Sequence, residues 1–370
     1  MVFGFREIQP TQEAAWDELV RVSPQGNAFL RAGTLRALAA HEHPAARVWR
    51  VGAFREDGTL AAGWAVLARS RAGLRYCSSF PLFYAGPILA PEWNEPKRVT
   101  QGMDLLKGLA RELQRGLDVI DTESAPGLPD ARGLIYAGCR AEQIYTHVWP
   151  ACPADDLVRQ LNRSKRQESA SAAGRHVFGW KTAEAETLDR FDRMHNQTLT
   201  KFKWVASRAW RATLLDNIRD LERIGVCRLF AAAPSSAPHE PCALVTVLLS
   251  PDHRCAWLWR VAYRTEDSGL IPALYLRAGE AVKREFGAEW TINFGGSPNL
   301  SLARFKDYLG AVPTPHWRIR WQRPGAKSLL WNGLQSVKEV GRRNLTLWNV
   351  IRPPRAAEGR ADEKAEDGGE

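Results

Sequence analysis

The sequence predicts an α/β fold with two tandem domains, each a mixed and mostly antiparallel sheet flanked by helices. The first observation behind this prediction is that the order of helices and strands in the first half of the chain recurs in the second. The second is a detailed internal repeat, because residues 120–138 align without a gap on residues 292–310. The matching pairs are Ile120 and Ile292, Pro126 and Pro298, Leu128 and Leu300, Ala131 and Ala303, Arg132 and Arg304, Tyr136 and Tyr308, and Gly138 and Gly310. The separation is too long for a solenoid and indicates two homologous halves.

Hydrophobic periodicity places the elements of the first half. Helices are expected where apolar residues recur every three or four positions, as at Leu106, Leu109 and Leu113, and strands where short apolar runs occur. The expected order is a strand at 5–8, helices around Trp16–Leu19 and Leu35–Leu38, strands at 48–53, 61–68 and 74–79, a helix at 97–115, a strand at 118–123, the repeat segment and a strand at 144–149. We place the first domain at residues 1–155.

The second half, at residues 156–324, is expected to follow the same order after a basic helical segment at 157–173. A helix at 183–202 carries Leu188, Phe191 and His195 on one face. The remaining elements are a helix near 210–223, strands at 226–232, 242–249 and 254–263, a helix through Leu274 and Val282, a strand at 290–292, the repeat helix and a strand at 316–321.

The C-terminal residues differ in composition from both domains. Residues 325–354 are basic and amphipathic, and residues 325–352 could attach peripherally to an anionic membrane surface or pack back onto the sheet. Residues 355–370 are acidic, have no large apolar side chain and are expected to be disordered.

The net charge and the cysteines of the chain indicate which kinds of partner and which cellular compartment are expected. The chain carries a formal net charge of +10 despite its acidic tail, which favours polyanionic partners such as nucleic acid, anionic lipid or sugar phosphates. Its 6 cysteines form no CxxC pair, and no leader or membrane-spanning run is evident, so a cytoplasmic location is expected. The 8 histidines show no metal-ligand spacing, and no P-loop or nucleophile elbow occurs, so no metal site is expected.

The second copy of the repeat carries a pair of residues that the first copy lacks. Phe305 and Lys306 stand where the first copy has Gly133 and Leu134. Ser297 is expected to cap the repeat helix, Pro298 to occupy its first turn and Gly310 to end it. The chemistry is therefore predicted to lie in the second half.

Three motifs resemble the FemABX-type family and its BioF2-like acetyltransferase relatives. They are the Phe294–Gly310 segment, the opening Trp16 with Ser23-Pro-Gln-Gly-Asn-Ala-Phe29, and Leu161-Asn-Arg-Ser-Lys-Arg166. The resemblance covers residues 5–322 and implies two tandem GNAT-type acyltransferase domains. Family members transfer amino acids from aminoacyl-tRNA to amines of peptidoglycan precursors, and others are associated with envelope polysaccharides. Some use a long helical hairpin in the second half as a tRNA-binding arm, and this sequence has no such insertion.

The resemblance implies roles for residues of the repeat helix. Lys306 would stabilise the developing oxyanion and Phe305 would contact the end of the acyl donor, whereas the alternative is a solvated lysine beside a core phenylalanine. Tyr308 matches the position of a general acid in many GNAT enzymes. Because Tyr136 occupies the same place in the first copy, a shared packing role is the alternative for Tyr308.

Two further groups of residues have candidate roles. Asp267, in the loop where GNAT domains that use coenzyme A bind pyrophosphate, could deprotonate the acceptor amine or cap the following helix. Its carboxylate and that of Glu266 would repel a pyrophosphate, which weakens the case for acetyl-CoA. Arg163, Lys165 and Arg166 could bind substrate phosphates or form a solvated face.

These observations predict a cytoplasmic N-acyltransferase that moves an aminoacyl or acyl group onto an amine of an envelope precursor, either peptidoglycan or polysaccharide. The donor would be aminoacyl-tRNA or acyl-CoA, with no tightly bound cofactor. One alternative is an acetyl-CoA-dependent acetyltransferase of exopolysaccharide biosynthesis. Another is a non-catalytic, basic nucleic-acid-binding protein, although the basic residues lie in no recognised base-reading motif.

Overall fold

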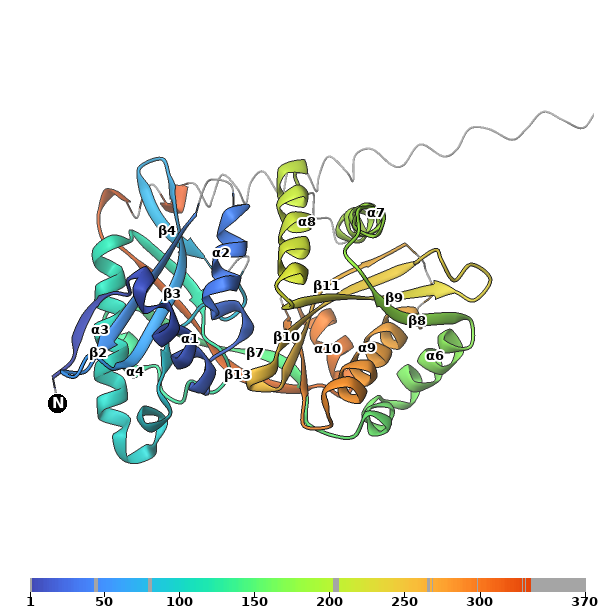
Figure 1. The fold of residues 1–370 in the computed structure, drawn as a ribbon, viewed down its shortest axis with the longest axis horizontal. Coiled ribbons are helices and arrows are strands. Elements are labelled where there is room, and N and C mark those ends of the chain that lie inside the picture. Colours follow the sequence, from blue (N-terminus) through green and yellow to red (C-terminus); the bar gives the residue numbers. More distant parts are fainter. Residues whose placement is uncertain are drawn as a thin grey trace, which may run out of the picture.

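The strands of this protein form one continuous sheet that joins two lobes (Figure 1). The computed structural model describes residues 2–42, 46–78, 82–201, 206–264, 267, 269–297, 299–327, 329 and 331–333. Within them the sheet has 13 strands, in the order β1-β2-β3-β4-β6-β13-β7-β12-β11-β10-β9-β8, with β5 paired to β3. The predicted mixed sheet, largely antiparallel, is confirmed.

The strands alternate with helices along the chain. The strands are β1 (Gly4–Glu7), β2 (Arg47–Phe54), β3 (Leu60–Arg71), β4 (Leu74–Ser78), β5 (Ile88–Leu89), β6 (Val119–Glu123), β7 (Arg140–Trp149), β8 (His176–Lys181), β9 (Cys227–Pro234), β10 (Ala243–Ser250), β11 (Cys255–Tyr263), β12 (Thr291–Gly296) and β13 (Val312–Gln322). The α-helices are α1 (Glu13–Val22), α2 (Ala32–Ala40), α3 (Val99–Gly116), α4 (Arg132–Tyr136), α5 (Leu157–Gln160), α6 (Arg163–Ala173), α7 (Ala185–Lys201), α8 (Arg208–Arg223), α9 (Leu270–Phe286) and α10 (Leu300–Tyr308).

The internal repeat is present in three dimensions. The unit α3-β6-α4-β7 in the first half recurs as α9-β12-α10-β13 in the second. Both copies end their short helix at a glycine with positive φ, 85° at Gly138 and 74° at Gly310. The left-handed stop predicted at Gly310 is therefore confirmed.

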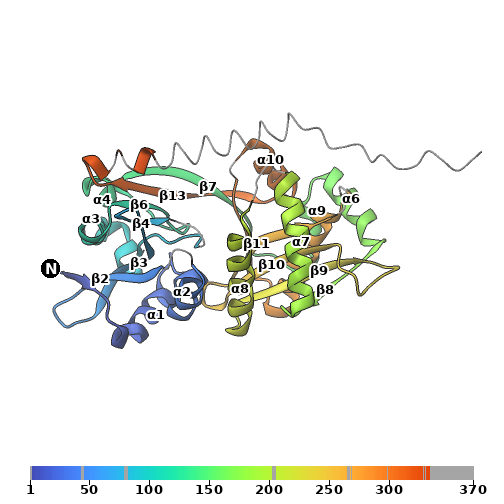
Figure 2. The ribbon, with the colours of Figure 1, turned by 90° about the horizontal axis from the view of Figure 1, so that it is seen from above.

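The two halves exchange their last strands. β7, which ends the first half, pairs with β12 of the second half, and β13, which ends the second half, pairs with β6 of the first. β7 and β13 also pair with each other from Arg140 to Val148, and they run side by side between the two lobes (Figure 2). The domain border that we placed at residue 155 falls between β7 and α5 in sequence, but the sheet does not divide there.

Two apolar clusters cover opposite faces of the second-half sheet. Along β10, Leu244 and Leu248 belong to the larger cluster, whereas Val245 and Val247 belong to the smaller one. The larger cluster continues into the first half and includes α7 and α8, and the smaller one contains α9. This period of two is what a strand buried on both faces requires.

The structure corrects three expectations, two of which concern helix caps. The basic segment predicted as one helix is broken between α5 and α6, because the Asn162 side chain accepts a hydrogen bond from the Lys165 N–H and starts a new helix. The cap of α10 is Asn299 rather than Ser297, since the Asn299 side chain accepts from the Leu302 N–H. Strand β8 was not expected at all.

The C-terminal expectations lie mostly outside the described residues. Of the basic segment predicted at 325–354, the structure describes 325–327, 329 and 331–333, and it describes none of 355–370. Both remain predictions. Pro298 lies outside the described residues, but α10 begins at Leu300 after its cap Asn299, so the first-turn position predicted for Pro298 is wrong.

Candidate functional site

The backbone pairing between β11 and β12 stops partway along the two strands, and this leaves a notch in the sheet. These parallel strands pair only from Cys255–Trp257 to Thr291–Asn293, although β11 continues to Tyr263 and β12 to Gly296. β11 also contains a bulge at Trp259, because Leu258 pairs with Val247 and Arg260 with Thr246. Bulges are frequent beside active sites, where they redirect side chains.

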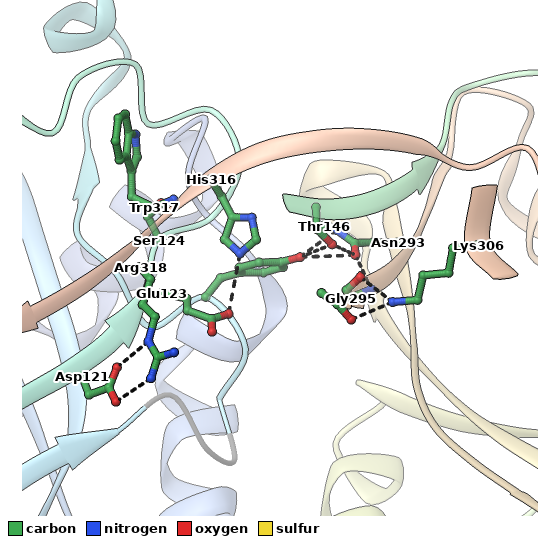
Figure 3. A network of polar contacts seen from close by, with 12 residues as sticks. Asp121, Glu123, Ser124, Thr146, Asn293, Gly295, Lys306, His316, Trp317 and Arg318 are labelled. Carbon is green, nitrogen blue, oxygen red and sulfur yellow. Dashed lines mark hydrogen bonds and ion pairs between the residues drawn. The ribbon is translucent and has the colours of Figure 1, made fainter. Parts of the chain in front are cut away.

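Lys306 lies at this notch and is buried. Its side chain points from α10 to the end of β12, where Nζ donates to the carbonyl oxygens of Gly295 and Gly296, both at 2.7 Å (Figure 3). The residue is only 4% exposed, which contradicts the alternative of a solvated lysine. No carboxylate among the described residues pairs with it.

Burial lowers the pKa of Lys306 to about 7 from the ordinary value of 10.5. An ammonium group has three N–H donors, and the two carbonyl oxygens accept two of them. The third remains able to stabilise a negative charge that develops on a substrate. Such a donor suits an oxyanion, because a hydrogen-bond donor that is already in place and shielded from water stabilises a negative charge strongly.

A buried hydrogen-bond network holds the turn that Lys306 binds. Asn293 Oδ1 accepts from the Gly295 N–H at 2.7 Å, from the Thr146 hydroxyl at 2.8 Å and from the Tyr84 hydroxyl at 3.2 Å. The Asn293 amide donates back to the Tyr84 oxygen at 3.1 Å. Tyr84 and Thr146 come from the first half of the chain, so both halves fix the position of Gly295.

Tyr84→Phe is expected to lower the free energy of unfolding by about 1–2 kcal/mol, because it removes a hydroxyl from a fully buried network. Burial raises the pKa of Tyr84, so the lost group is a neutral phenol. Tyr145→Phe is the matched control, since Tyr145 is 52% exposed and should change stability by less than about 0.5 kcal/mol. Urea unfolding of both variants tests this, and equal stabilities would show that the network does not support the turn.

The first half has no equivalent of this lysine. Leu134, at the position of Lys306 in the repeat, is fully buried, and a side chain at Gly133 would overlap the backbone of Met103 in α3. The tight packing of α4 on α3 thus leaves no room for a Phe-Lys pair. This difference supports the prediction that the catalytic residues lie in the second half of the chain.

Phe305 packs in the smaller apolar cluster, as the alternative of a core phenylalanine expects, and Tyr308 lies on the surface. Phe305 is half-buried in the smaller cluster, with its ring 6.2 Å from that of Tyr275. Tyr308 is 49% exposed and Tyr136 is 62% exposed. Exposure at both positions does not support a shared packing role, and the role of Tyr308 as a general acid stays a prediction.

Asp267 forms contacts typical of a cap. Its Oδ1 accepts from the Gly269 N–H at 3.0 Å and its Oδ2 from Arg175 at 2.7 Å. The Arg175 hydrogen bond lowers the pKa of Asp267, which makes the carboxylate a weaker base. These contacts favour the capping alternative, and its catalytic role stays a prediction. Glu266 lies outside the described residues.

The basic cluster lies on α6. Lys165 pairs with Glu168 at 2.6 Å, Arg166 donates to the carbonyl oxygen of Leu161 at 3.0 Å, and Arg163 is exposed. Arg166 also lines a groove of about 350 Å³ between α6 and α9. The cluster is therefore accessible to a phosphate, and its binding role stays a prediction.

The described residues lack two features that would bear on the function of the site. No three His, Cys, Asp or Glu side chains within them are grouped as metal ligands would be. No described helix combines the length and the apolar composition that crossing a bilayer requires.

Comparisons with solved structures identify the fold. The chain superposes on FemX with a TM-score of 0.63 at 12% identity, covering 85% of this chain and 96% of FemX. A tandem GNAT protein from the clavulanic acid biosynthesis pathway gives a TM-score of 0.54 at 12% identity, covering 88% and 100%. The C-terminal domain of a putative lysylphosphatidylglycerol synthetase from Agrobacterium fabrum gives 0.53 at 13% identity, covering 88% and 96%. No family model and no curated protein matches the sequence.

The predicted resemblance is thus confirmed at the level of the fold, which is of the FemX-like, tandem GNAT type. The residues around Lys306 that sequence patterns did not reveal are Tyr84, Thr146 and Asn293. Asn293 lies within the repeat at residues 292–310, but a buried asparagine has no distinguishing sequence pattern. Thr146 reaches the site through the exchange of strands, and Tyr84 reaches it from the segment between β4 and β5.

Proposed function

We propose that this protein, with the fold of FemX and of a tandem GNAT protein, is an N-acyltransferase that moves an aminoacyl or acyl group onto an amine of a cell-envelope precursor. The observation that carries the proposal is Lys306, a buried ammonium held by two carbonyl oxygens at the notch between β11 and β12. A cation buried without a carboxylate partner is costly to fold, so its place at the notch is better explained by chemistry than by stability.

In the proposed reaction, a neutral amine attacks the carbonyl carbon of the acyl donor and the carbonyl oxygen becomes an oxyanion. The third N–H of Lys306 stabilises that oxyanion, while the bonds to Gly295 and Gly296 keep Nζ in place. Phe305, beside it on α10, would contact the end of the donor. The basic residues of α6, Arg163, Lys165 and Arg166, would bind phosphates of the donor or acceptor.

The packing of α6 favours aminoacyl-tRNA over acyl-CoA as the donor. Gly269, at the start of α9, lies against the backbone of Glu168 in α6, where even a Cβ atom would overlap the Glu168 carbonyl oxygen. The Asp267 carboxylate already accepts the Gly269 N–H. The start of α9 is where a pyrophosphate would be expected to bind, and among the described residues the Glu168 carbonyl oxygen and the Asp267 carboxylate lie against it, both of which disfavour an anion.

Calorimetry with two donors tests this preference. Coenzyme A is expected to bind weakly or not at all, whereas a charged tRNA should bind with an affinity that falls steeply between 50 and 200 mM salt, as phosphate contacts require. The variant Arg163→Gln with Arg166→Gln should reduce the salt slope, and Arg21→Gln, on α1, is the control for loss of surface charge. Tight binding of acetyl-CoA would instead favour the acetyltransferase of exopolysaccharide biosynthesis.

The function itself is tested by following label from acyl donor to acceptor. Aminoacyl-tRNA and acyl-CoA donors would each be mixed with amine-bearing nucleotide-sugar and lipid-linked envelope precursors, and amide products identified by mass spectrometry. The proposal expects an amide with at least one pair, formed in the cytoplasm or at the inner face of the membrane. Absence of any amide, with salt-dependent binding of tRNA or DNA alone, would favour a non-catalytic nucleic-acid-binding protein.

A further inference from the structure

His147 forms a chain of polar contacts beside Lys306. It is 4% exposed, and its Nδ1 lies 3.3 Å from the Ser297 hydroxyl oxygen. Its Nε2 lies 3.4 Å from Asp307 Oδ1. Ser297 follows β12 and Asp307 follows Lys306 on α10, so three separate elements converge on one imidazole.

The two contacts assign the proton on the imidazole. The Asp307 carboxylate, 3.4 Å from Nε2, favours the tautomer with its proton on Nε2, which leaves a lone pair on Nδ1. The Ser297 hydroxyl can then donate to Nδ1. Ser297 is half-buried and His147 is 4% exposed, so the serine is the more accessible of the two residues.

The surroundings keep the imidazole neutral near pH 7. Burial lowers the pKa of His147, the nearby Lys306 ammonium lowers it further, and Asp307 opposes both. Lys306 and Asp307, both on α10, are the charged groups that act on it within the described residues. A neutral imidazole with a serine donor on one side and a carboxylate on the other is able to accept a proton.

The internal repeat provides a comparison within the same chain. Ser297, Lys306 and Asp307 correspond to Ala125, Leu134 and Ile135 in the first copy. His147 on β7 corresponds to Ile319 on β13, the strand that the second copy contributes to the first-half sheet. Every one of the four is apolar there. A structural role in closing the sheet would be needed equally in both copies, whereas a catalytic role is needed only where Lys306 is present.

We propose that Ser297, His147 and Asp307 form a proton relay that takes the proton from the acceptor amine and returns it to the leaving group. The inference rests on the proposed acyl transfer and adds to it the base that the reaction requires. Because His147 belongs to β7, the second-half site would be incomplete without the strand that the first half contributes.

In this relay one proton passes from the acceptor amine to the leaving group. The acceptor reaches the site as R–NH2, and its nitrogen bonds to the carbonyl carbon while Lys306 stabilises the oxyanion. The amine proton moves to Ser297 Oγ as the Ser297 proton moves to His147 Nδ1, and Asp307 stabilises the imidazolium. The bond to the leaving oxygen or sulfur then breaks, and the same proton returns through Ser297 to that atom. The products are an amide and the free hydroxyl of tRNA or thiol of coenzyme A.

The test is the pH dependence of kcat for amide formation with the full chain. His147→Gln should lower kcat about 10²-fold and remove the acid limb, which in the wild-type protein lies below pH 6.5 because the pKa of His147 is lowered. Ser297→Ala should lower kcat similarly, and Asp307→Asn by about tenfold, with KM little changed. His253→Gln is the control for loss of a histidine whose pKa burial also lowers, and should leave kcat and the acid limb intact.

Three outcomes of these experiments decide whether the proton relay and the proposed function hold. Loss of kcat and of the acid limb in His147→Gln, with Ser297→Ala equally slow and still folded by thermal unfolding, supports the relay. A wild-type protein that forms amide while either variant keeps full kcat overturns the relay alone. A wild-type protein that forms no amide with any donor and acceptor overturns the proposed function, and the relay with it.

Discussion

Lys306→Met is expected to lower turnover by about 10²- to 10³-fold while the protein remains folded. Methionine retains the aliphatic stem that packs in α10 but removes the ammonium, so the oxyanion loses its preorganised donor. The carbonyl oxygens of Gly295 and Gly296 also lose their partner, but both belong to a turn that Asn293 still holds. Single-turnover rates of amide formation, together with thermal unfolding, measure the two effects separately.

The pH dependence gives an independent test of Lys306. Its pKa is about 7, so the fraction that is protonated falls as the pH rises from 6 to 8. If the ammonium stabilises the transition state, kcat of the wild-type protein should decline through this range. The residual activity of Lys306→Met should show no such decline. With the acid limb assigned to His147, the wild-type profile is expected to be bell-shaped.

Leu134→Met is the matched control, because Leu134 holds the same position in the first copy of the repeat. This substitution between apolar residues of similar volume should cost less than about 1.5 kcal/mol of stability and leave turnover unchanged. A folded Lys306→Met variant with wild-type turnover would remove Lys306 from the mechanism.

Gly310→Ala is expected to have the largest effect on stability, about 3 kcal/mol or more. Its φ of 74° is unfavourable for any residue with a Cβ atom, at about 1–2 kcal/mol. A Cβ atom there would also overlap the carbonyl oxygen of Gln160, at the end of α5. That backbone cannot withdraw easily, because the Asn162 N–H donates to the Tyr308 carbonyl oxygen at 2.9 Å.

The repeat again supplies the control. Gly138 has a similar φ of 85°, but a Cβ atom there would meet nothing within 4 Å. Gly138→Ala should therefore cost only the backbone term of about 1–2 kcal/mol. Denaturant unfolding of the two variants isolates the steric contribution of α5. Equal losses of stability would mean that the segment from Gln160 to Asn162 moves away without cost.

Much of the candidate site followed from local patterns in the chain. The gapless repeat predicted two equivalent halves, and the absence of Phe-Lys from the first copy directed attention to Lys306. Gly310 was identified as a helix stop because a left-handed conformation has a recognisable residue preference. These properties depend on residues close together in sequence, where periodicity and turn chemistry act.

Side-chain environment was less predictable. On sequence grounds Lys306 could be either catalytic or solvated, whereas in the structure its ammonium is buried against the carbonyl oxygens of Gly295 and Gly296. Asp267 could act as either base or cap on sequence grounds, and only the positions of Arg175 and Gly269 favour the cap. Such choices depend on partners distant in sequence, whose approach no local pattern encodes.

The order of the elements and the identity of the repeat helix thus follow from the amino-acid sequence alone, because hydrophobic period and capping are local. The tertiary structure decided which strands pair. The exchange of β7 and β13 brings Thr146 and His147 of the first half beside Asn293 and Lys306 of the second. Strand pairing depends on the packing of whole sheet faces rather than on any short segment. The residues that surround Lys306 could therefore be assembled only by the complete fold.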